Sequence, residues 1–582
     1  MEENMKIKLS ANGFESHGEL LKRKIEERIP VEFTNDGMQI ELGINAVLEK
    51  EESYQISGEG DCWKITGADV AGLYYGIGKF LHTAKWSELD FVPMPPTEMI
   101  APDCDFRATY FSIHFYNWYY QAEAEELGKY VEEIMLWGYN TIVCIIPLVN
   151  FNSCDEPEFF RAVNKIRSVF VLAKKMNMKV GIIINPNQGL KTTPAEFEAD
   201  PSCYDNRCTL TGKNICPSIP GAMEYMRYLW VMMLKRFTDI GLDYLVTWPY
   251  DEGGCGCENC RPWGANGFAE LSREVSKELK RFYPNAKFIY STWFFDQPDD
   301  EGEFSGLYAR LNDDDMQYID YLMSDAGKGY QPYVLEHDVI KPVVNFPEIS
   351  MWRLYPWGGR GANPLPKRFQ EIWDKTKYVM SGGMPYSEGM YEDILKVQYA
   401  GYYWDKNRHY SSILKEYINY EYGNDVQDEV LEMMELIEIN HVGVGSRQEP
   451  DMEAARRAKE LAEIVDAKLV EKRKLAWRWR ILYIRAQIDL MVYDFYQDKG
   501  KNMTWTNPWN RKMKDADGTI VQPGETISAL ALMWRTPKEY LEDNEKAQEL
   551  MQELCDWYHC VDEDPEKGNK YTLPPVKGGK VL

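Results

Sequence analysis

The chain has 582 residues, of which 44% are hydrophobic and 27% charged, and its formal net charge is −26. This length exceeds one ordinary hydrophobic core, so we expect two to four folded domains. The acidic balance argues against nucleic-acid partners, which require basic patches, and against anionic membrane surfaces. No run approaches the ~20 apolar residues that a membrane-spanning helix requires.

Residues 1–100 predict a small N-terminal α/β domain. Alternating runs at 54–57 and 63–66 flank a glycine-containing turn and indicate a β-hairpin. The apolar segment 72–81 predicts a helix. We interpret its spaced glycines as helix-packing positions, because a phosphate loop would need a preceding strand and a Lys-Ser/Thr pair. A proline-rich linker over 93–102 separates this domain from the rest.

Residues 101–404 predict a (β/α)8 TIM barrel, because eight strand candidates are separated mostly by apolar helical patterns. These candidates are 107–114, 141–147, 179–185, 243–248, 287–293, 317–323, 342–346 and 383–387. A doubly wound sheet is the alternative, but no dinucleotide-binding fingerprint opens it. Residues 405–582 predict a mainly helical domain, since the strand signal fades and helical periodicity dominates.

Two adjacent carboxylates, Asp251 and Glu252, follow the predicted fourth strand. Strand side chains alternate between faces, so neighbouring acids serve one site only where the strand is ending. Barrel enzymes place their chemistry at the carboxyl ends of the strands, and paired acids there are typical of enzymes that cleave glycosidic bonds. Trp248 and Tyr250 crowd the pair and would raise the pKa of one carboxyl. The alternative is two solvated loop acids.

This acidic pair resembles that of the β-N-acetylhexosaminidases of glycoside hydrolase families 20 and 123. The resemblance implies that Glu252 is the general acid/base. It also implies that Asp251 polarises the 2-acetamido group of the substrate, which replaces an enzyme nucleophile. The expected activity is therefore exo-acting, retaining cleavage of terminal β-GalNAc or β-GlcNAc. The N-terminal domain also looks like the accessory domain of hexosaminidases and α-glucuronidases, so the resemblance covers roughly residues 1–400.

Further substrate-binding residues are predicted at other strand ends. Arg107 resembles the arginine that holds the terminal sugar in family 20. Glu388 suits hydroxyl recognition, with a nucleophile or a helix-capping carboxylate as the alternatives. Rings and an imidazole complete the predicted pocket, although each ring suits a core equally well. These residues are His114, Tyr250, Trp293, Trp352 and Tyr386.

Two rival interpretations remain open. The first is an α-glucuronidase-like or endo-acting glycosidase that uses Glu252 with Glu388. The second is a sugar-binding barrel without catalysis. A carbohydrate is the expected partner in every case, and homo-oligomer formation stays open.

A cysteine cluster follows the acidic pair. No apolar segment follows the acidic chain start, so we expect a cytoplasmic protein, although a chain whose secretion signal had been removed would look the same. Clustered cysteines in a reducing compartment favour metal over disulfides.

Cys255, Cys257 and Cys260 offer three ligands for Zn²⁺, which takes four in a tetrahedron. Cys216 is the predicted fourth ligand, with Cys203 and Cys208 as competitors. Four sulfur ligands leave no open position, so this zinc would brace the loop, and catalysis would need no cofactor. Reduced thiols that pack the loop are the alternative.

Overall fold

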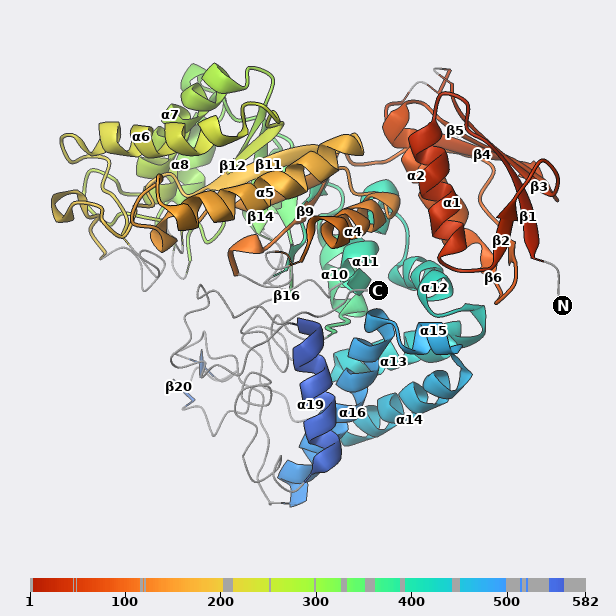
Figure 1. Ribbon diagram of the computed structural model, residues 1–582. Helices are drawn as coiled ribbons and strands as arrows, with labels where there is room; N and C mark the ends of the chain where they lie inside the picture. Colours follow the sequence, from red (N-terminus) through yellow and green to blue (C-terminus); the bar gives the residue numbers. More distant parts are fainter. Residues whose placement is uncertain are drawn as a thin grey trace.

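The structure is a computed structural model. It describes residues 4–45, 47–48, 50–115, 119, 122–201, 213–250, 253–297, 300–325, 332–350, 362–387, 393–441, 451–498, 513–514, 520–521 and 544–558. Figure 1 shows the N-terminal domain in red beside the barrel, with the C-terminal helices in cyan to blue below both. Among the described helices, none is long and apolar enough to cross a membrane.

The N-terminal domain is a mixed sheet with two helices against it (Figure 1). The strand order is β2-β1-β3-β5-β4-β8. Their bounds are β1 Met5–Ser10, β2 Val31–Phe33, β3 Met38–Ile44, β4 Tyr54–Glu59, β5 Cys62–Gly67 and β8 Met99–Ile100, with α1 at Glu15–Glu26 and α2 at Val70–Thr83. β4 and β5 form the expected antiparallel hairpin. A short hairpin of β6 (Lys85–Trp86) and β7 (Phe91–Val92) follows α2.

Helix α2 packs on both sides, against its own sheet and against the barrel. The Asp69 carboxylate caps it by accepting a 2.8 Å hydrogen bond from the Gly72 backbone N–H. A β-carbon on Gly72 would lie 2.1 Å from the Ser53 carbonyl oxygen, and one on Gly78 would lie 2.1 Å from that of Leu136. The prediction that these glycines are packing positions is therefore confirmed.

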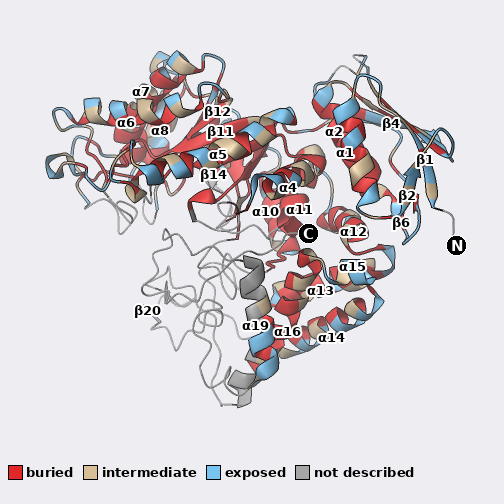
Figure 2. Cartoon of the chain, in the orientation of Figure 1, coloured by how far each residue is buried: buried red, intermediate tan, exposed pale blue. Residues whose placement is uncertain are grey.

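Eight parallel strands close into a barrel in the order β10-β11-β12-β13-β14-β15-β17-β9, which confirms the predicted fold class. Their bounds are β9 Phe106–Tyr110, β10 Thr141–Ile145, β11 Lys179–Ile184, β12 Tyr244–Thr247, β13 Lys287–Ser291, β14 Tyr321–Asp325, β15 Val343–Phe346 and β17 Met380–Gly383. The short strands β16 (Glu348–Ser350) and β18 (Tyr386–Ser387) extend the seventh and eighth strands and pair with each other. Helices surround the outside of the barrel and side chains fill its interior, so the strands are buried (Figure 2).

The helices complete the barrel and form the C-terminal region. In the barrel they are α4 Ala124–Leu136, α5 Pro157–Lys175, α6 Ala222–Leu234, α7 Gly267–Phe282, α8 Glu303–Arg310, α9 Pro332–Glu336, α10 Pro366–Thr376 and α11 Asp393–Trp404. After it come α12 Tyr410–Glu421, α13 Gln427–Ile439, α14 Met452–Lys468, α15 Glu471–Lys474, α16 Trp477–Asp498 and α19 Glu545–Tyr558, with a small hairpin of β19 (Met513–Lys514) and β20 (Ile520–Val521).

Arg107 links the barrel to the N-terminal domain. Its wholly buried guanidinium donates to the Glu52 carboxylate at 2.6 Å and to the backbone carbonyls of Gly138 at 2.8 Å and Cys104 at 2.9 Å. Asn140 donates to the same carboxylate at 3.0 Å. We expected Arg107 to hold a sugar, but it lies at the amino end of β9, opposite the end where barrel enzymes bind substrates. Its donors are occupied by the protein, so we leave it out of the candidate site.

The neighbouring positive charges keep the Glu52 carboxyl ionised. Burial alone would raise the pKa of Glu52, but the charges of Arg107 and Lys179 outweigh it and hold the pKa below its ordinary value. A carboxyl with a lowered folded-state pKa stabilises the fold above the ordinary glutamate pKa of about 4.3, and loses that contribution as the pH falls through the folded-state value.

We predict that Arg107→Ala lowers the free energy of unfolding by about 3–5 kcal/mol, because it leaves the Glu52 carboxylate buried without its main partner. Urea unfolding at pH 7 measures this change. Arg457→Ala is the matched control, since its pair with Glu432 is exposed and its loss should leave the midpoint unchanged. The difference in the free energy of unfolding between wild type and Arg107→Ala should become smaller below pH 4, where Glu52 is protonated. A difference that grows there would contradict the pairing.

Candidate active site

Strand register decides which side chains meet at the carboxyl end of the barrel. The rings of Phe106 and Tyr244 pack inside the barrel with their centroids 4.9 Å apart. Side chains alternate along a strand, so Trp248, four residues beyond Tyr244, faces inward as well. Paired residues on neighbouring strands face the same side of the barrel wall. Tyr244 pairs with Gly181 and Lys287, and Asn185 and Trp293 lie an even number of residues beyond these, so both face inward.

A continuous set of aromatic rings lines this end of the barrel. Trp248 packs on Trp293 and on Phe346, with centroids 5.1 Å and 4.6 Å apart. Tyr386 packs on Phe346 and on Tyr110, at 4.9 Å in each case. The predicted residues Trp293 and Tyr386 therefore belong to one aromatic surface that spans the first, fourth, fifth, seventh and eighth strands.

Glu348 places a buried carboxylate at the same end. It opens β16, directly after the seventh barrel strand, and is 1% exposed. Its Oε1 accepts a hydrogen bond from the Trp293 indole Nε1 at 3.2 Å. The sequence analysis missed Glu348; its signal was an acid that follows the strand Val343–Phe346 after a single proline.

Asn185 brings an amide that the protein does not use. It follows β11, is 5% exposed, and within the described part of the chain neither its oxygen nor its nitrogen has a hydrogen-bond partner. An unpaired buried polar group costs about 1–3 kcal/mol, so it requires an explanation. An amide offers both a donor and an acceptor, and a bound hydroxyl group can satisfy both.

His114 and Tyr250 occupy the edges of the site. His114 follows β9 and lies 3.1 Å from the Tyr110 hydroxyl through its Nδ1. The buried Tyr250 donates its hydroxyl to the Glu303 carboxylate, which also accepts the backbone N–H groups of Gly264 and Asp296 at 2.8 Å. Tyr250 therefore anchors the loop after the fourth strand to α8, a role that sequence reasoning did not predict.

Asn187 holds the other side of that loop. Its amide donates to the Gly254 carbonyl at 2.8 Å and accepts from the Gly254 N–H at 3.1 Å. It also donates to the Ile215 carbonyl at 3.1 Å. The segment that carries the acidic pair is thus fixed just before it by Tyr250 and just after it by Gly254.

Four predicted residues lie outside the described part of the chain. They are Asp251, Glu252, Trp352 and Glu388. Their roles stay predictions, although the described flanks place the loop of Asp251 and Glu252 at the carboxyl end of β12. Of the four predicted zinc ligands, Cys255, Cys257 and Cys260 follow the acidic pair and Cys216 lies in the loop after the third strand, with all four Sγ atoms within 4.8 Å of one another.

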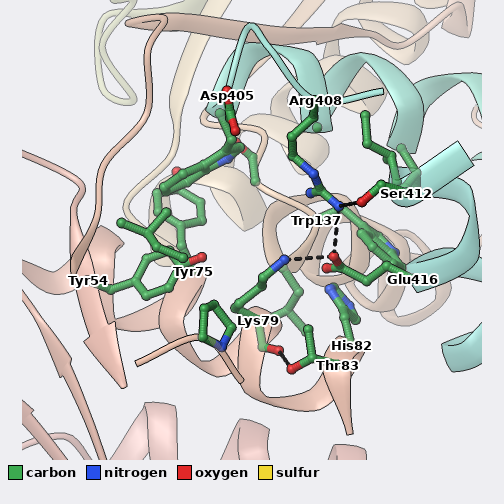
Figure 3. Close-up of a pocket in the computed structure, with 18 of the residues that line it drawn as sticks. Tyr54, Tyr75, Lys79, His82, Thr83, Trp137, Asp405, Arg408, Ser412 and Glu416 are labelled. Atoms are coloured by element: carbon green, nitrogen blue, oxygen red, sulfur yellow. Dashed lines mark hydrogen bonds and ion pairs between the residues drawn. The ribbon is translucent and has the colours of Figure 1, made fainter. Parts of the chain in front are cut away.

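A separate cavity of 530 Å³ lies at the opposite end of the barrel, between α2, α4, α11 and α12 (Figure 3). Three of its charged groups pair with one another, since Glu416 accepts from Lys79 at 2.7 Å and from Arg408 at 3.1 Å. None of the predicted site residues that the structure describes lines this cavity. We therefore place the candidate active site at the carboxyl end.

No family model matches the sequence, and comparison with curated proteins finds no match. Solved structures with a similar fold include a family 138 glycoside hydrolase that targets the pectin rhamnogalacturonan II, at 13% identity and a TM-score of 0.54, covering 85% of this chain and 71% of that one. A family 89 glycoside hydrolase from Clostridium perfringens aligns at 10% identity with a TM-score of 0.58, over 84% of this chain and 62% of that one. A family 20 exo-β-N-acetylglucosaminidase from Vibrio harveyi aligns with a TM-score of only 0.48 at 12% identity, over 72% and 75% of the chains. The shared feature is the fold, and the likeness does not assign the chain to family 20.

Two asparagines in one loop make a matched pair of substitutions. Asn187→Ala should lower the melting temperature, because it leaves the Gly254 N–H and two carbonyls unpaired, at about 1–3 kcal/mol each. Asn185→Ala should leave the melting temperature close to that of wild type, because the amide it removes has no partner. Differential scanning calorimetry measures both. If both variants lost the same amount of melting temperature, Asn185 would be a structural residue and would no longer belong to the candidate site.

Proposed function

We propose that the chain is a glycoside hydrolase that releases a terminal N-acetylhexosamine. One observation carries the proposal: the buried Glu348 carboxylate and the rings of Trp248 and Trp293 share the end of the barrel to which β12 delivers Asp251 and Glu252. Carboxylates supply the acid and base of glycosidic cleavage, and aromatic rings pack against the C–H faces of sugars.

In this proposal Glu252 and Asp251 perform substrate-assisted cleavage of a β-linked GalNAc or GlcNAc. Glu252 protonates the glycosidic oxygen while the acetamido oxygen attacks the anomeric carbon, so the aglycone leaves as an alcohol. Asp251 accepts a hydrogen bond from the acetamido N–H and stabilises the oxazolinium ion. Glu252 then takes a proton from water, which opens the ring with net retention of configuration.

The inward-facing groups supply recognition. The unpaired Asn185 amide can bond a sugar hydroxyl, and Glu348 can accept a second one. The solved family 89 enzyme was crystallised with GlcNAc-α-1,4-galactose and with 2-acetamido-1,2-dideoxynojirimycin. A barrel of the same fold thus accommodates a 2-acetamido sugar, which supports the substrate class proposed for this chain.

A second candidate function follows from Glu348 itself. A buried acid directly after the seventh strand, together with an acid after the fourth, would suit a two-carboxylate glycosidase. Glu252 would again be the acid, and Glu348 would be the nucleophile or the base. The Glu348 carboxylate accepts a hydrogen bond from the Trp293 N–H, which orients it. Glu348 would then replace Glu388 as the second acid.

Hydrolysis of p-nitrophenyl β-GlcNAc and β-GalNAc tests the proposal. Glu252→Gln should lower kcat on substrates with poor leaving groups by about 10²–10⁴, the usual share of acid/base catalysis. Asp251→Asn should lower kcat as well, and a thiazoline analogue of the acetamido intermediate should inhibit. Glu278→Gln is the control, because this buried glutamate lies on α7 outside the barrel and should leave the rate unchanged.

Glu348→Gln separates the two candidate functions. Substrate assistance predicts a raised KM with much of kcat retained, whereas the two-carboxylate enzyme predicts a collapse of kcat and no inhibition by the thiazoline. Full activity of Glu252→Gln on a poor leaving group would contradict both. A wild-type chain that binds GlcNAc but cleaves no glycoside would be a sugar-binding barrel.

A further inference from the structure

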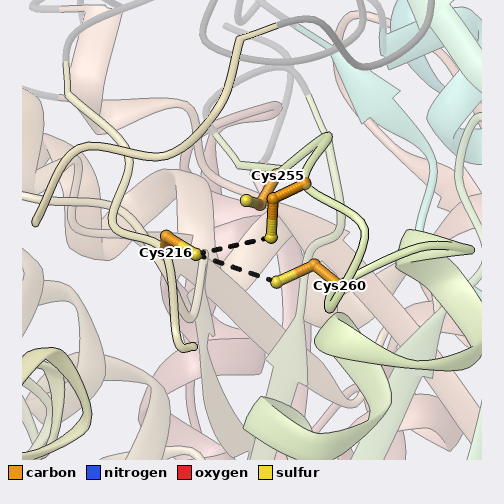
Figure 4. A group of neighbouring side chains, drawn as sticks. Cys216, Cys255 and Cys260 are labelled. Atoms are coloured by element: carbon orange, nitrogen blue, oxygen red, sulfur yellow. Dashed lines mark hydrogen bonds between the residues drawn. The ribbon is translucent and has the colours of Figure 1, made fainter. Parts of the chain in front are cut away.

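Four cysteine side chains from two loops converge beside the candidate active site. Figure 4 shows Cys216, Cys255 and Cys260 turned toward one another. The Cys216 Sγ lies 3.7 Å from that of Cys257 and 3.9 Å from that of Cys260, and all four Sγ atoms lie within 4.8 Å of one another. We propose that these four thiolates bind one Zn²⁺ ion and that this ion fixes the loop carrying the acidic pair.

The dimensions of the cluster fit a single tetrahedral ion. Zinc–sulfur bonds of about 2.3 Å place the sulfurs of a tetrahedron about 3.8 Å apart. The Sγ separations from Cys216 to Cys257 and to Cys260, 3.7 Å and 3.9 Å, bracket this value. Disulfide sulfurs lie only about 2.0 Å apart, so the same distances do not describe bonded pairs. Four thiolates around one tetrahedral centre are ligands typical of Zn²⁺, and a multinuclear iron–sulfur cluster would need a wider cage.

Backbone hydrogen bonds hold the two loops that carry the four thiols. The Ile215 N–H donates to the Asn187 carbonyl at 2.7 Å, and the Cys216 N–H donates to the Phe197 carbonyl at 2.9 Å. In the other loop, the Gly256 N–H donates to the Asp200 carbonyl at 2.9 Å.

The turn between the last two ligands is closed as well, because the Cys260 N–H donates to the Cys257 carbonyl at 3.0 Å. Cys216, Cys255 and Cys260 are buried and Cys257 is half-buried, so the cage is largely shielded from water. The competitors Cys203 and Cys208 lie outside the described residues.

The ion would connect the loop after the third strand to the loop after the fourth. Cys216 belongs to the first loop, and Cys255 stands three residues beyond Glu252 in the second. Asn187 joins the same two loops by its hydrogen bonds to Ile215 and Gly254. Four protein sulfurs leave no position for water, so the metal would position the acidic pair and would not activate a nucleophile. This effect on catalysis rests on the proposed function, whereas metal binding does not.

Metal analysis of the purified full-length protein tests the site. We expect one zinc per chain in the wild type, and loss of most of it in Cys216→Ser and in the double variant Cys255→Ser/Cys260→Ser. Cys62→Ser and Cys104→Ser are the controls and should retain the zinc, because these cysteines lie outside the cluster. The wild type reconstituted with Co²⁺ should show the intense visible absorption of tetrahedral thiolate coordination, which gives a readout even if a variant fails to fold.

Three results would overturn the zinc site. They are a zinc-free wild type whose melting temperature does not respond to added zinc, a disulfide between any two of the four cysteines in native mass spectrometry, and zinc that persists in the double variant. Removal of the metal by a chelator should lower the melting temperature and kcat together. If the protein binds zinc but cleaves no glycoside, the proposed function fails and the metal site stands.

Discussion

The closed register of eight parallel strands is the constraint on which the candidate site depends. Side chains alternate along each strand and paired residues share a side, so one inward-facing pair, Phe106 and Tyr244, determines which residues face the barrel interior. That parity brings Asn185, Trp248 and Trp293 to one end, although they lie far apart in the sequence. The chemistry of the site follows from the barrel geometry and from the residues at the carboxyl end of each strand.

The two ends of the barrel differ in how their buried polar groups are paired. At the amino end, Arg107 and Glu52 join the N-terminal domain to the strands through a buried ion pair. At the carboxyl end, the buried Glu348 carboxylate accepts a hydrogen bond from the Trp293 indole N–H, and the buried Asn185 amide has no partner among the described residues. Arg107 is thus satisfied by the protein, whereas the Asn185 amide can still bond a ligand.

Sequence reasoning predicted the barrel because eight apolar runs alternate with helical patterns. It predicted Cys255, Cys257 and Cys260 from their close spacing, and Cys216 from its place after the third strand. It misplaced Arg107, since an arginine at the start of a strand gives no sign of which partner will neutralise it. It missed Glu348, because burial and the bond to Trp293 arise only when the fifth and seventh strands close together. It gave Tyr250 a substrate-binding role, whereas the hydroxyl bonds to Glu303, 53 residues away.

The central claim is that the carboxyl end of the barrel binds the sugar to be cleaved. A crystal structure of the protein with N-acetylglucosamine tests it most directly. The account predicts a sugar ring packed on the aromatic surface of Trp248 and Trp293, with a hydroxyl bonded to the Asn185 amide and the anomeric carbon facing Glu252. A sugar bound instead in the cavity of Lys79 and Glu416, or nowhere at the carboxyl end, would contradict it.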